Sequence, residues 1–242
     1  MLLPVLGGET GDGFALVEGG GTALVELGAA AEETGRRIAS AVDAGVEVVL
    51  VCAGEAGEFN AGAGVVAAIE DGGGLRGATL VVLCETRAAW GTQPAAPGAS
   101  PAHEDGRLLA AGATAADLRR DPRGAAMTAA GGGLAGALWA QYDAALVPGP
   151  AFVLEQLDFD ARMRAARAVI VGEARIDRGT LAGRVAGEAA IRARQAGVPC
   201  HAVVANQAID RFDARILDLQ AIVEAATIQE LEAAGEQIAR VP

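Results

Sequence analysis

One short segment gathers the side chains that could handle a phosphate, a metal ion or a hydroxyl group. It reads Gly172-Glu-Ala-Arg-Ile-Asp177 and places two carboxylates, Glu173 and Asp177, around the guanidinium of Arg175. The apolar run Ala168–Val171 before it predicts a β-strand. The segment is therefore expected just beyond the carboxyl end of that strand, where open α/β sheets bind ligands. An exposed turn held by salt bridges is the alternative interpretation.

Two glycine-rich segments have similar positions. Gly131-Gly-Gly133 stands at the start of a predicted helix, where bare backbone N–H groups and the helix dipole favour an anion. Close packing in an alanine-rich core is its more ordinary explanation. Gly54–Gly64 follows the predicted strand Val46–Cys52, and glycine lets the backbone approach a ligand closely. Neither segment is a Walker motif or a strand–GxGxxG–helix unit, which disfavours a Rossmann-type oxidoreductase.

The spacing and position of the cysteine, serine and histidine residues argue against disulfides, a zinc site and catalysis by a serine or histidine side chain. The cysteines are widely separated and predict buried structural thiols rather than disulfides or a zinc site. Neither serine lies in a nucleophile elbow, which excludes a serine hydrolase. The two histidines are interpreted as structural or solvent-exposed. These residues are Cys52, Cys84 and Cys200, Ser40 and Ser100, and His103 and His201.

The composition predicts a well-formed core and an acidic surface. The 242 residues are 52% hydrophobic but only 3% aromatic, so alanine, valine, leucine and isoleucine must fill one large domain or two small ones. All 19 basic residues are arginine, and the net charge of -12 argues against nucleic acid and anionic membranes as partners. An anionic small-molecule substrate would need a local pocket of arginine and backbone N–H groups. Without a basic leader or a long apolar run, a cytoplasmic protein is expected.

Short apolar runs alternate with alanine-rich helical segments, which is typical of α/β proteins with parallel or mixed sheets flanked by helices. The expected strands are a hairpin of Phe14–Glu18 with Thr22–Leu27, then Val46–Cys52, Thr79–Cys84, Ala168–Val171, His201–Val204 and Ala221–Val223. The expected helices are 32–44, 62–70, 131–143, 149–166 and 180–195, a last helix with a Thr227…Glu230 capping box, and short ones near Arg107 and at 114–120. Residues 85–125 are predicted to be rich in loops, and Pro148-Gly149 to break the helical pattern.

From residue 129 onward, a series of motifs follows in a fixed order. It comprises Ala129–Leu138, Leu146–Gly149, Val153–Glu155, Phe159–Arg162, Ala168–Asp177, Thr180–Gly183 and Ala196–Pro199. The series resembles the A-A-G-G-L-G, P-G-I-E-L-V-L-E, F-D-E-R-L and V-I-T-G-E-G-R-L-D motifs of the bacterial ATP-dependent glycerate kinases. Upstream, Thr22–Leu27 and Asp43–Val51 resemble the T-A-V-I-E-M and D-A-G-A-R-R-I-I-V segments of the same family.

The resemblance implies a two-domain α/β fold. Residues 1–148 would be the middle α/β domain, and residues 149–242 the C-terminal βαβ half of an incomplete flavodoxin-like domain. The implied reaction transfers the γ-phosphoryl group of ATP to a hydroxyl of D-glycerate with Mg²⁺. The implied catalytic residues are Asp177, Glu173 and Asn60, of which Asp177 and Glu173 would also bind the metal. Substrate or phosphate binding falls to Arg175, Arg184, Glu55, Gly132, Gly133 and Gly172.

Several motifs of the family are changed or absent. Asn60 stands where the family has Asp, and Glu85 and Arg87 take the places of the two acidic residues of C-D-V-D. The P-Q-K-G, S-F-K-G-S and D-G-G-E-G-T motifs are missing, so we expect the chain to begin after the last two, and it contains no lysine to replace theirs.

These departures leave a second interpretation open. The chain would then be a truncated homologue without kinase activity that binds a small hydroxy acid or a nucleotide, or acts as an interaction partner. Half a domain would also leave a sheet edge and apolar helix faces uncovered. We therefore expect a homo-oligomer.

Overall fold

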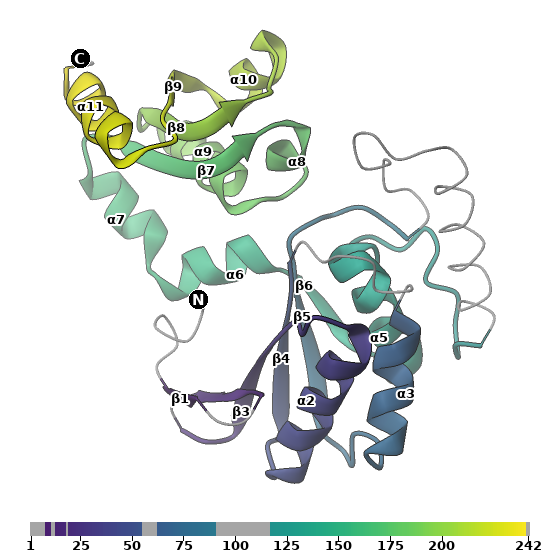
Figure 1. Cartoon of the computed structure of the whole chain (residues 1–242). Helices are drawn as coiled ribbons and strands as arrows, with labels where there is room; N and C mark the ends of the chain where they lie inside the picture. The colour runs from purple at the N-terminus through teal and green to yellow at the C-terminus, as the bar shows by residue number, and fades with distance from the viewer. Residues whose placement is uncertain (1–7, 11–12, 18, 55–61, 91–116, 241–242) are drawn as a thin grey trace. The chain divides into compact units, whose positions relative to one another are not determined.

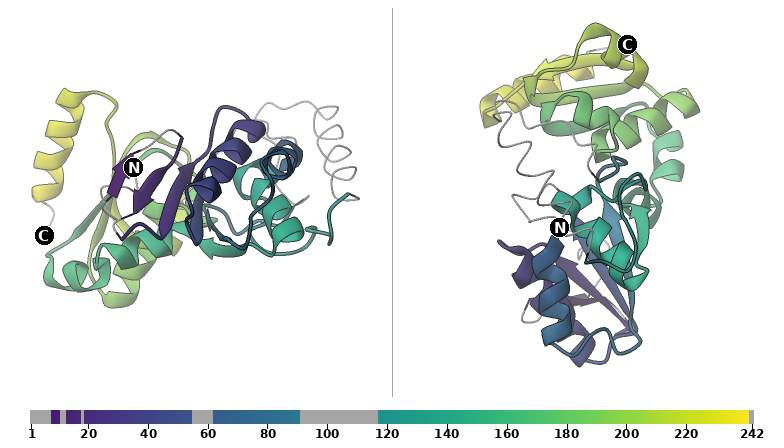
Figure 2. Two further views of the ribbon diagram at one scale, coloured as in Figure 1. Left: turned by 90° about the horizontal axis from the view of Figure 1, so that it is seen from below. Right: turned by 90° about the vertical axis from the view of Figure 1, so that its right-hand side faces the viewer.

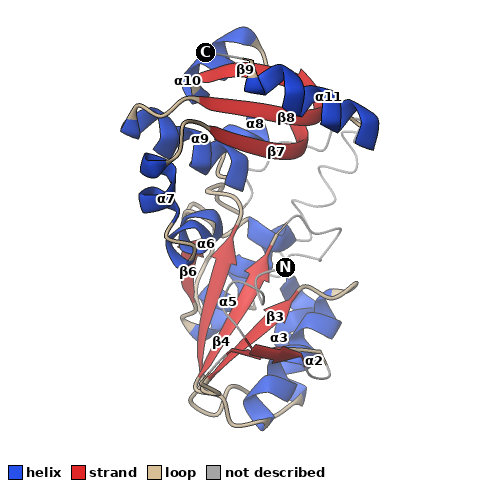
Figure 3. Cartoon of the chain, turned by 90° about the vertical axis from the view of Figure 1, so that its left-hand side faces the viewer, coloured by secondary structure: helices blue, strands red, loops and turns tan. Residues whose placement is uncertain are grey.

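The computed structural model of the chain divides into two compact units, Met1–Phe152 and Val153–Pro242. It describes residues 8–10, 13–17, 19–54, 62–90 and 117–240. Each unit contains a β-sheet flanked by helices, as predicted for an α/β protein with parallel and mixed sheets (Figure 3). Among the described residues, no helix combines the length and the apolar character needed to span a membrane.

The first unit is built on a six-stranded mixed sheet in the order β1-β2-β3-β4-β5-β6. Strands β1 to β3 pair antiparallel and strands β3 to β6 pair parallel. The pairing of β2 with β3 confirms the predicted hairpin. The strands are β1 Gly8–Thr10, β2 Ala15–Val17, β3 Thr22–Glu26, β4 Val48–Ala53, β5 Thr79–Cys84 and β6 Ala145–Pro148.

Strand β6 was not predicted, because its sequence is short and ends in Pro148. It pairs in parallel with Val81–Cys84 of β5, and among the described strands it has β5 as its only neighbour. Proline is tolerated at such a sheet edge because no further ladder hydrogen bond needs its missing N–H group.

Helices pack against the sheet of the first unit and bury its β-branched side chains. They are α2 Ala31–Asp43, α3 Ala63–Asp71, the 3-10 helix η2 Ala130–Gly133 and α5 Leu134–Tyr142. Helices α2 and α3 lie side by side (Figures 1 and 2). A Cβ atom at Gly35 would lie 2.6 Å from the carbonyl oxygen of Val65, so only glycine permits this close approach. The core contains Val25, Val49, Val51, Val82, Ile38, Val65, Ile69, Leu134 and Leu138.

The second unit is built on a three-stranded parallel sheet in the order β7-β8-β9. The strands are β7 Val169–Ile176, β8 Cys200–Gln207 and β9 Leu219–Glu224; the helices are α6 Gly149–Gln156, α7 Phe159–Ala165, α8 Arg178–Leu181, α9 Val185–Ala196, α10 Arg211–Leu217 and α11 Ile228–Ala239. Helix α6 begins within the first unit. The alanine face of α9 is buried with the apolar side chains of the sheet. The assignment of residues 149–242 to a flavodoxin-like domain stays a prediction.

Local boundaries in the second unit differ from the predicted ones. The predicted helix 149–166 is divided into α6 and α7, because Asp158 takes a left-handed conformation with φ 50°. The predicted helix 180–195 is divided into α8 and α9, with Gly183 at φ +128° between them. The capping box of Thr227 and Glu230 at α11 is confirmed. The helix near Arg107 lies outside the described residues, and residues 117–120 form turns and bends rather than a helix.

Candidate functional site

Strand β7 contains most of the segment that the sequence placed just beyond the end of a strand. Its parallel pairing with β8 continues from Val169 to Ile176, so Gly172, Glu173 and Arg175 are strand residues. Only Asp177 follows the carboxyl end of the strand. The prediction that the whole segment lies beyond the strand was therefore wrong. Glycine, glutamate and alanine have low strand propensity, but the ladder of hydrogen bonds to β8 overrides that preference.

Asp177 begins helix α8 as its N-cap. Its Oδ1 accepts the backbone N–H of Gly179 at 2.8 Å. The hydroxyl of Thr180 accepts the backbone N–H of Asp177 at 3.2 Å, which completes a capping box. Side chains within the sequence Asp-Arg-Gly-Thr thus accept hydrogen bonds from the backbone N–H groups of Gly179 and Asp177. These bonds fix the position of the Asp177 carboxylate.

Thr180 also connects this cap to Glu173. The residue is 1% exposed, and its hydroxyl donates to Oε2 of Glu173 at 2.7 Å. A Cβ atom at Gly187 would overlap the carbonyl oxygen of Thr180, so helix α9 packs directly on the backbone of α8 at this point. The sequence placed Thr180 in a helix but did not indicate its contact with Glu173, although a Thr three residues after an Asp is a recognisable capping pattern.

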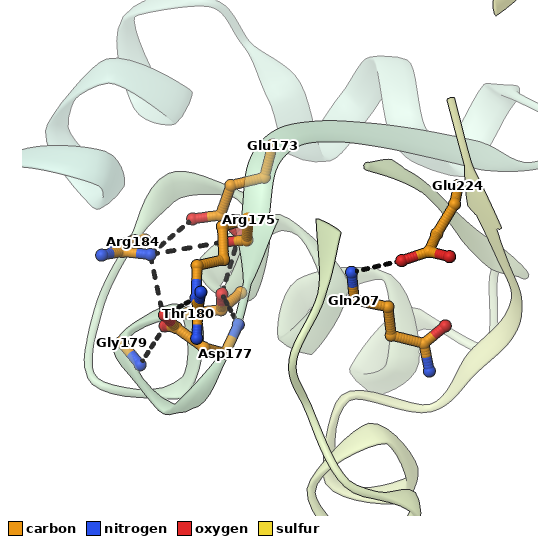
Figure 4. A network of polar contacts seen from close by, with 8 residues as sticks. All are labelled: Glu173, Arg175, Asp177, Gly179, Thr180, Arg184, Gln207 and Glu224. Carbon is orange, nitrogen blue, oxygen red and sulfur yellow. Dashed lines mark hydrogen bonds and ion pairs between the residues drawn. The ribbon is translucent and has the colours of Figure 1, made fainter. Parts of the chain in front are cut away.

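Arg184, the N-cap residue of α9, joins the two carboxylates (Figure 4). Its Nη1 lies 3.4 Å from Oε1 of Glu173 and 3.3 Å from Oδ1 of Asp177. The same nitrogen lies 3.4 Å from the backbone oxygen of Arg175. Two helix starts and one strand therefore bring Glu173, Asp177 and Arg184 together.

Burial differs among these charged groups. The side chains of Glu173, Arg184 and Asp177 are 15%, 25% and 28% exposed. Burial raises the pKa of Glu173 above its ordinary value, although the Thr180 hydroxyl and the Arg184 guanidinium act in the opposite direction. The cluster is thus partly desolvated, and its charges act on one another more strongly than exposed charges would.

Arg175 is the most exposed member of the group. Its side chain is 55% exposed, and its Nε donates to Oδ2 of Asp177 at 3.1 Å. Within the part of the chain that the structure describes, that carboxylate is its only side-chain partner. The remaining guanidinium donors can face a ligand, and a planar fork of donors matches a carboxylate or a phosphate.

Two further polar residues stand at the same edge of the sheet. Oε1 of Glu224, the last residue of β9, accepts the backbone N–H of Gln207 at 2.8 Å. Gln207 ends β8 and pairs in register with Ile176. The carboxyl ends of all three parallel strands thus carry polar groups, which is where ligands bind in open α/β sheets. No motif in the sequence indicated Gln207 or Glu224.

The glycine turn of the first unit has a mainly structural explanation. Gly131, Gly132 and Gly133 have φ values of 60°, 63° and 95°, and Gly131 and Gly133 are buried. A Cβ atom at Gly131 would lie 3.3 Å from the Cβ of Ala53. The N–H of Gly133 donates to the carbonyl of Ala129 at 3.1 Å. Left-handed backbone and close packing therefore account for these glycines, and the anion contact of Gly132 and Gly133 stays a prediction.

The predicted site residues that follow strand β4 are only partly described. Asn60 and Glu55 lie outside the described residues. At the end of strand β4, a Cβ atom at Gly54 would lie 3.3 Å from Oε2 of Glu85, which places the ends of β4 and β5 next to each other. These residues and the glycine turn belong to the first unit, whereas the Glu173–Arg184 cluster belongs to the second.

The family of the chain follows from comparison with known proteins. The family model described as "Glycerate kinase family" matches residues 86–240, which include the whole Glu173–Arg184 cluster. The chain belongs to the glycerate kinase family. No curated protein matches it.

A solved structure agrees with the fold of this glycerate kinase family member. The crystal structure of putative glycerate kinase 2 from Salmonella typhimurium LT2 is similar with a TM-score of 0.58 and 24% sequence identity. The match covers 93% of this chain and 75% of the other. At this level of identity the likeness concerns the fold, and it includes both α/β units described above.

Proposed function

We propose that the chain transfers the γ-phosphoryl group of ATP to a hydroxyl of D-glycerate or a closely related hydroxy acid. One observation carries the proposal: the segment matched by the family model presents Arg175, half exposed, at the carboxyl edge of a parallel sheet. Both ATP and glycerate are anions, and in a protein of net charge -12 their recognition depends on such local arginines.

Arg175 is assigned to the carboxylate of the hydroxy acid or to a phosphate. Phosphoryl transfer depends mainly on positioning and on stabilising developing charge, and a guanidinium can do both. Glu173, Asp177 and Asn60 are the proposed catalytic residues, with Glu55, Arg184 and the glycines Gly132, Gly133 and Gly172 as further binding positions.

A magnesium ion does not fit the present arrangement of Glu173 and Asp177. Their four carboxylate oxygens already accept from Thr180, Arg184, Gly179 and Arg175. Among the residues in the described ranges, no group of three or more histidine, cysteine, aspartate or glutamate side chains could hold a metal ion. No step of the proposal therefore passes through a metal held by these residues.

The contacts of the two carboxylates favour a second function, which is ligand binding without phosphoryl transfer. A carboxylate that is engaged by arginine and hydroxyl donors is poorly placed to accept a proton from a substrate hydroxyl. The chain would then bind a small hydroxy acid or a nucleotide through Arg175 but would not turn it over.

A coupled ADP assay with Mg-ATP and D-glycerate separates the two functions. Turnover of about 1 s⁻¹ or more, within the usual range for enzymes, supports transfer. Turnover below detection, together with phosphate or glycerate binding by calorimetry, supports binding alone. Arg175→Ala is expected to weaken that binding about tenfold, equivalent to roughly 1.4 kcal/mol.

Arg178→Ala is the matched control for the Arg175 variant. Arg178 belongs to the same segment, is 86% exposed and pairs with Asp213 at 3.3 Å. Its removal changes the net charge equally but is expected to leave ligand binding unchanged. Equal loss of binding in both variants contradicts the role assigned to Arg175. A wild type that shows neither turnover nor binding contradicts both functions.

Two sequence-based expectations complete the proposal. The protein is proposed to act in the cytoplasm. It is also proposed to form a homo-oligomer. Sedimentation at increasing protein concentration tests the oligomer, and a monomer at every concentration contradicts it.

A further inference from the structure

The three oxygen atoms around Arg184 form an arrangement that resembles a cation site. Oε1 of Glu173, Oδ1 of Asp177 and the backbone oxygen of Arg175 all lie 3.3 to 3.4 Å from one nitrogen, Nη1 of Arg184 (Figure 4). Two carboxylates and a carbonyl are the kind of hard oxygen donors that Mg²⁺ and Mn²⁺ prefer. In this chain a guanidinium nitrogen lies where they converge.

We propose that Arg184 is the built-in cation of this cluster and takes the place that a divalent metal ion would occupy between Glu173 and Asp177. The proposal concerns the metal preference of the cluster and does not require that the chain transfer phosphate.

The charges of the cluster support this assignment. Glu173 and Asp177 contribute two negative charges, and Arg184 and Arg175 contribute two positive charges within 3.1 to 3.4 Å of them. The charges of these four described side chains sum to zero, so together they offer a divalent ion no net attraction. A metal ion would also have to displace donors from oxygens that already accept hydrogen bonds, and these groups are largely buried.

The backbone around Arg184 fixes the guanidinium in this place. Arg184 is the N-cap residue of α9, and the first turn of α9 packs on Thr180 through Gly187. A Cβ atom at Gly179 would lie 3.0 Å from Cζ of Arg184 and 2.9 Å from Oδ1 of Asp177. The absence of a side chain at Gly179 therefore leaves room for the guanidinium beside the carboxylate.

Mn²⁺ binding, followed by the electron paramagnetic resonance signal of the free ion, tests the proposal. The wild type and Glu173→Gln are expected to bind Mn²⁺ equally weakly, because Glu173 holds no metal ion in the wild type. Arg184→Gln is expected to bind Mn²⁺ at least tenfold more tightly than the wild type, and the double variant R184Q/E173Q to lose the gain. Arg178→Gln is the matched control, because it removes the same charge from a neighbouring arginine that has no contact with Glu173.

Two results would overturn the assignment. One is Mn²⁺ binding by the wild type that Glu173→Gln weakens. The other is an Arg184→Gln variant that binds Mn²⁺ no more tightly than Arg178→Gln while amide exchange of β7 and β8 shows that it is folded. If Arg184→Gln does not fold, the comparison of the wild type with Glu173→Gln decides alone. Neither readout uses kinase activity, so failure here and failure of the proposed function are separate results.

Discussion

Two turns of this chain, Gly131–Gly133 in the first unit and Asp177–Arg184 in the second, are held by different forces. In the first, left-handed backbone and tight packing require glycine, and one N–H of the turn is used within the chain. In the second, side-chain hydrogen bonds and ion pairs join two helix starts to a strand. Substitution of Gly131 in the first should therefore change stability alone, whereas substitutions in the second should change ligand or metal binding as well as stability.

The largest effect is expected at Gly187, because this glycine packs tightly on the backbone of Thr180, whose side chain belongs to the hydrogen-bonded cluster. In Gly187→Ala the new methyl group would overlap the carbonyl of Thr180, which is backbone and cannot rotate away. We expect a loss of about 3 kcal/mol or more from the stability of the second unit, at the upper end of overpacking effects. Thermal unfolding and amide exchange of β7 and β8 measure it.

Gly235→Ala provides the control on another helix of the same unit. A Cβ atom at Gly235 has no neighbour within 4 Å, and the residue lies inside α11. Alanine there should stabilise the helix by about 0.5–1 kcal/mol, because glycine has the greater conformational freedom to lose. Equal effects of the two substitutions would show that α9 does not pack on Thr180 as described.

Thr180→Val tests the hydroxyl that connects the α8 cap to Glu173. Valine keeps the volume but leaves Oε2 of Glu173 and the N–H of Asp177 without this partner. A cost of about 1–3 kcal/mol is expected for such buried groups. Thr180→Ser retains the hydroxyl and should recover most of the loss in the same unfolding measurement; no recovery would mean that the methyl group, not the hydroxyl, matters.

Gly131→Ala tests the opposite side of the comparison. An L-residue such as alanine loses about 1–2 kcal/mol of stability at φ 60°, and its Cβ atom would lie 3.3 Å from the Cβ of Ala53. The fluorescence of Trp90 and Trp139, both in the first unit, should report this loss on unfolding. Phosphate affinity at Arg175 should remain that of the wild type. A variant with normal stability but weaker phosphate binding would transfer the anion site to the glycine turn.

The sequence predicted the arrangement of elements better than their ends. Strand Thr79–Cys84 was predicted to the residue, because a short apolar run rich in β-branched residues favours a buried strand. The end of β7 was missed, because Glu173 and Arg175 are held in the strand by pairing with β8, which a single segment does not reveal. The same limit applies to the site. The charges were visible in Gly172–Asp177, whereas the contact of Thr180 with Glu173 and the packing of Gly187 on Thr180 are made only in three dimensions.

The smallest effect is expected for the pH dependence of stability that Glu173 contributes. Burial raises its pKa in the folded protein, with the Thr180 and Arg184 contacts opposing that rise. The folded state therefore holds the Glu173 proton more tightly than the unfolded chain does. Stabilisation by the protonated side chain is fully present below the ordinary glutamate pKa of about 4.5 and is lost as the pH rises through the folded pKa above it. The free energy of unfolding of the wild type relative to Glu173→Gln should consequently decrease between pH 4 and pH 7, as denaturant titrations at the two values would show. An increase of this difference between pH 4 and pH 7 would mean that the ion pair of Glu173 with Arg184 outweighs the effect of burial on the pKa of Glu173. Charge attraction would then contribute more to the stability of the Asp177–Arg184 turn than the burial of Glu173 does.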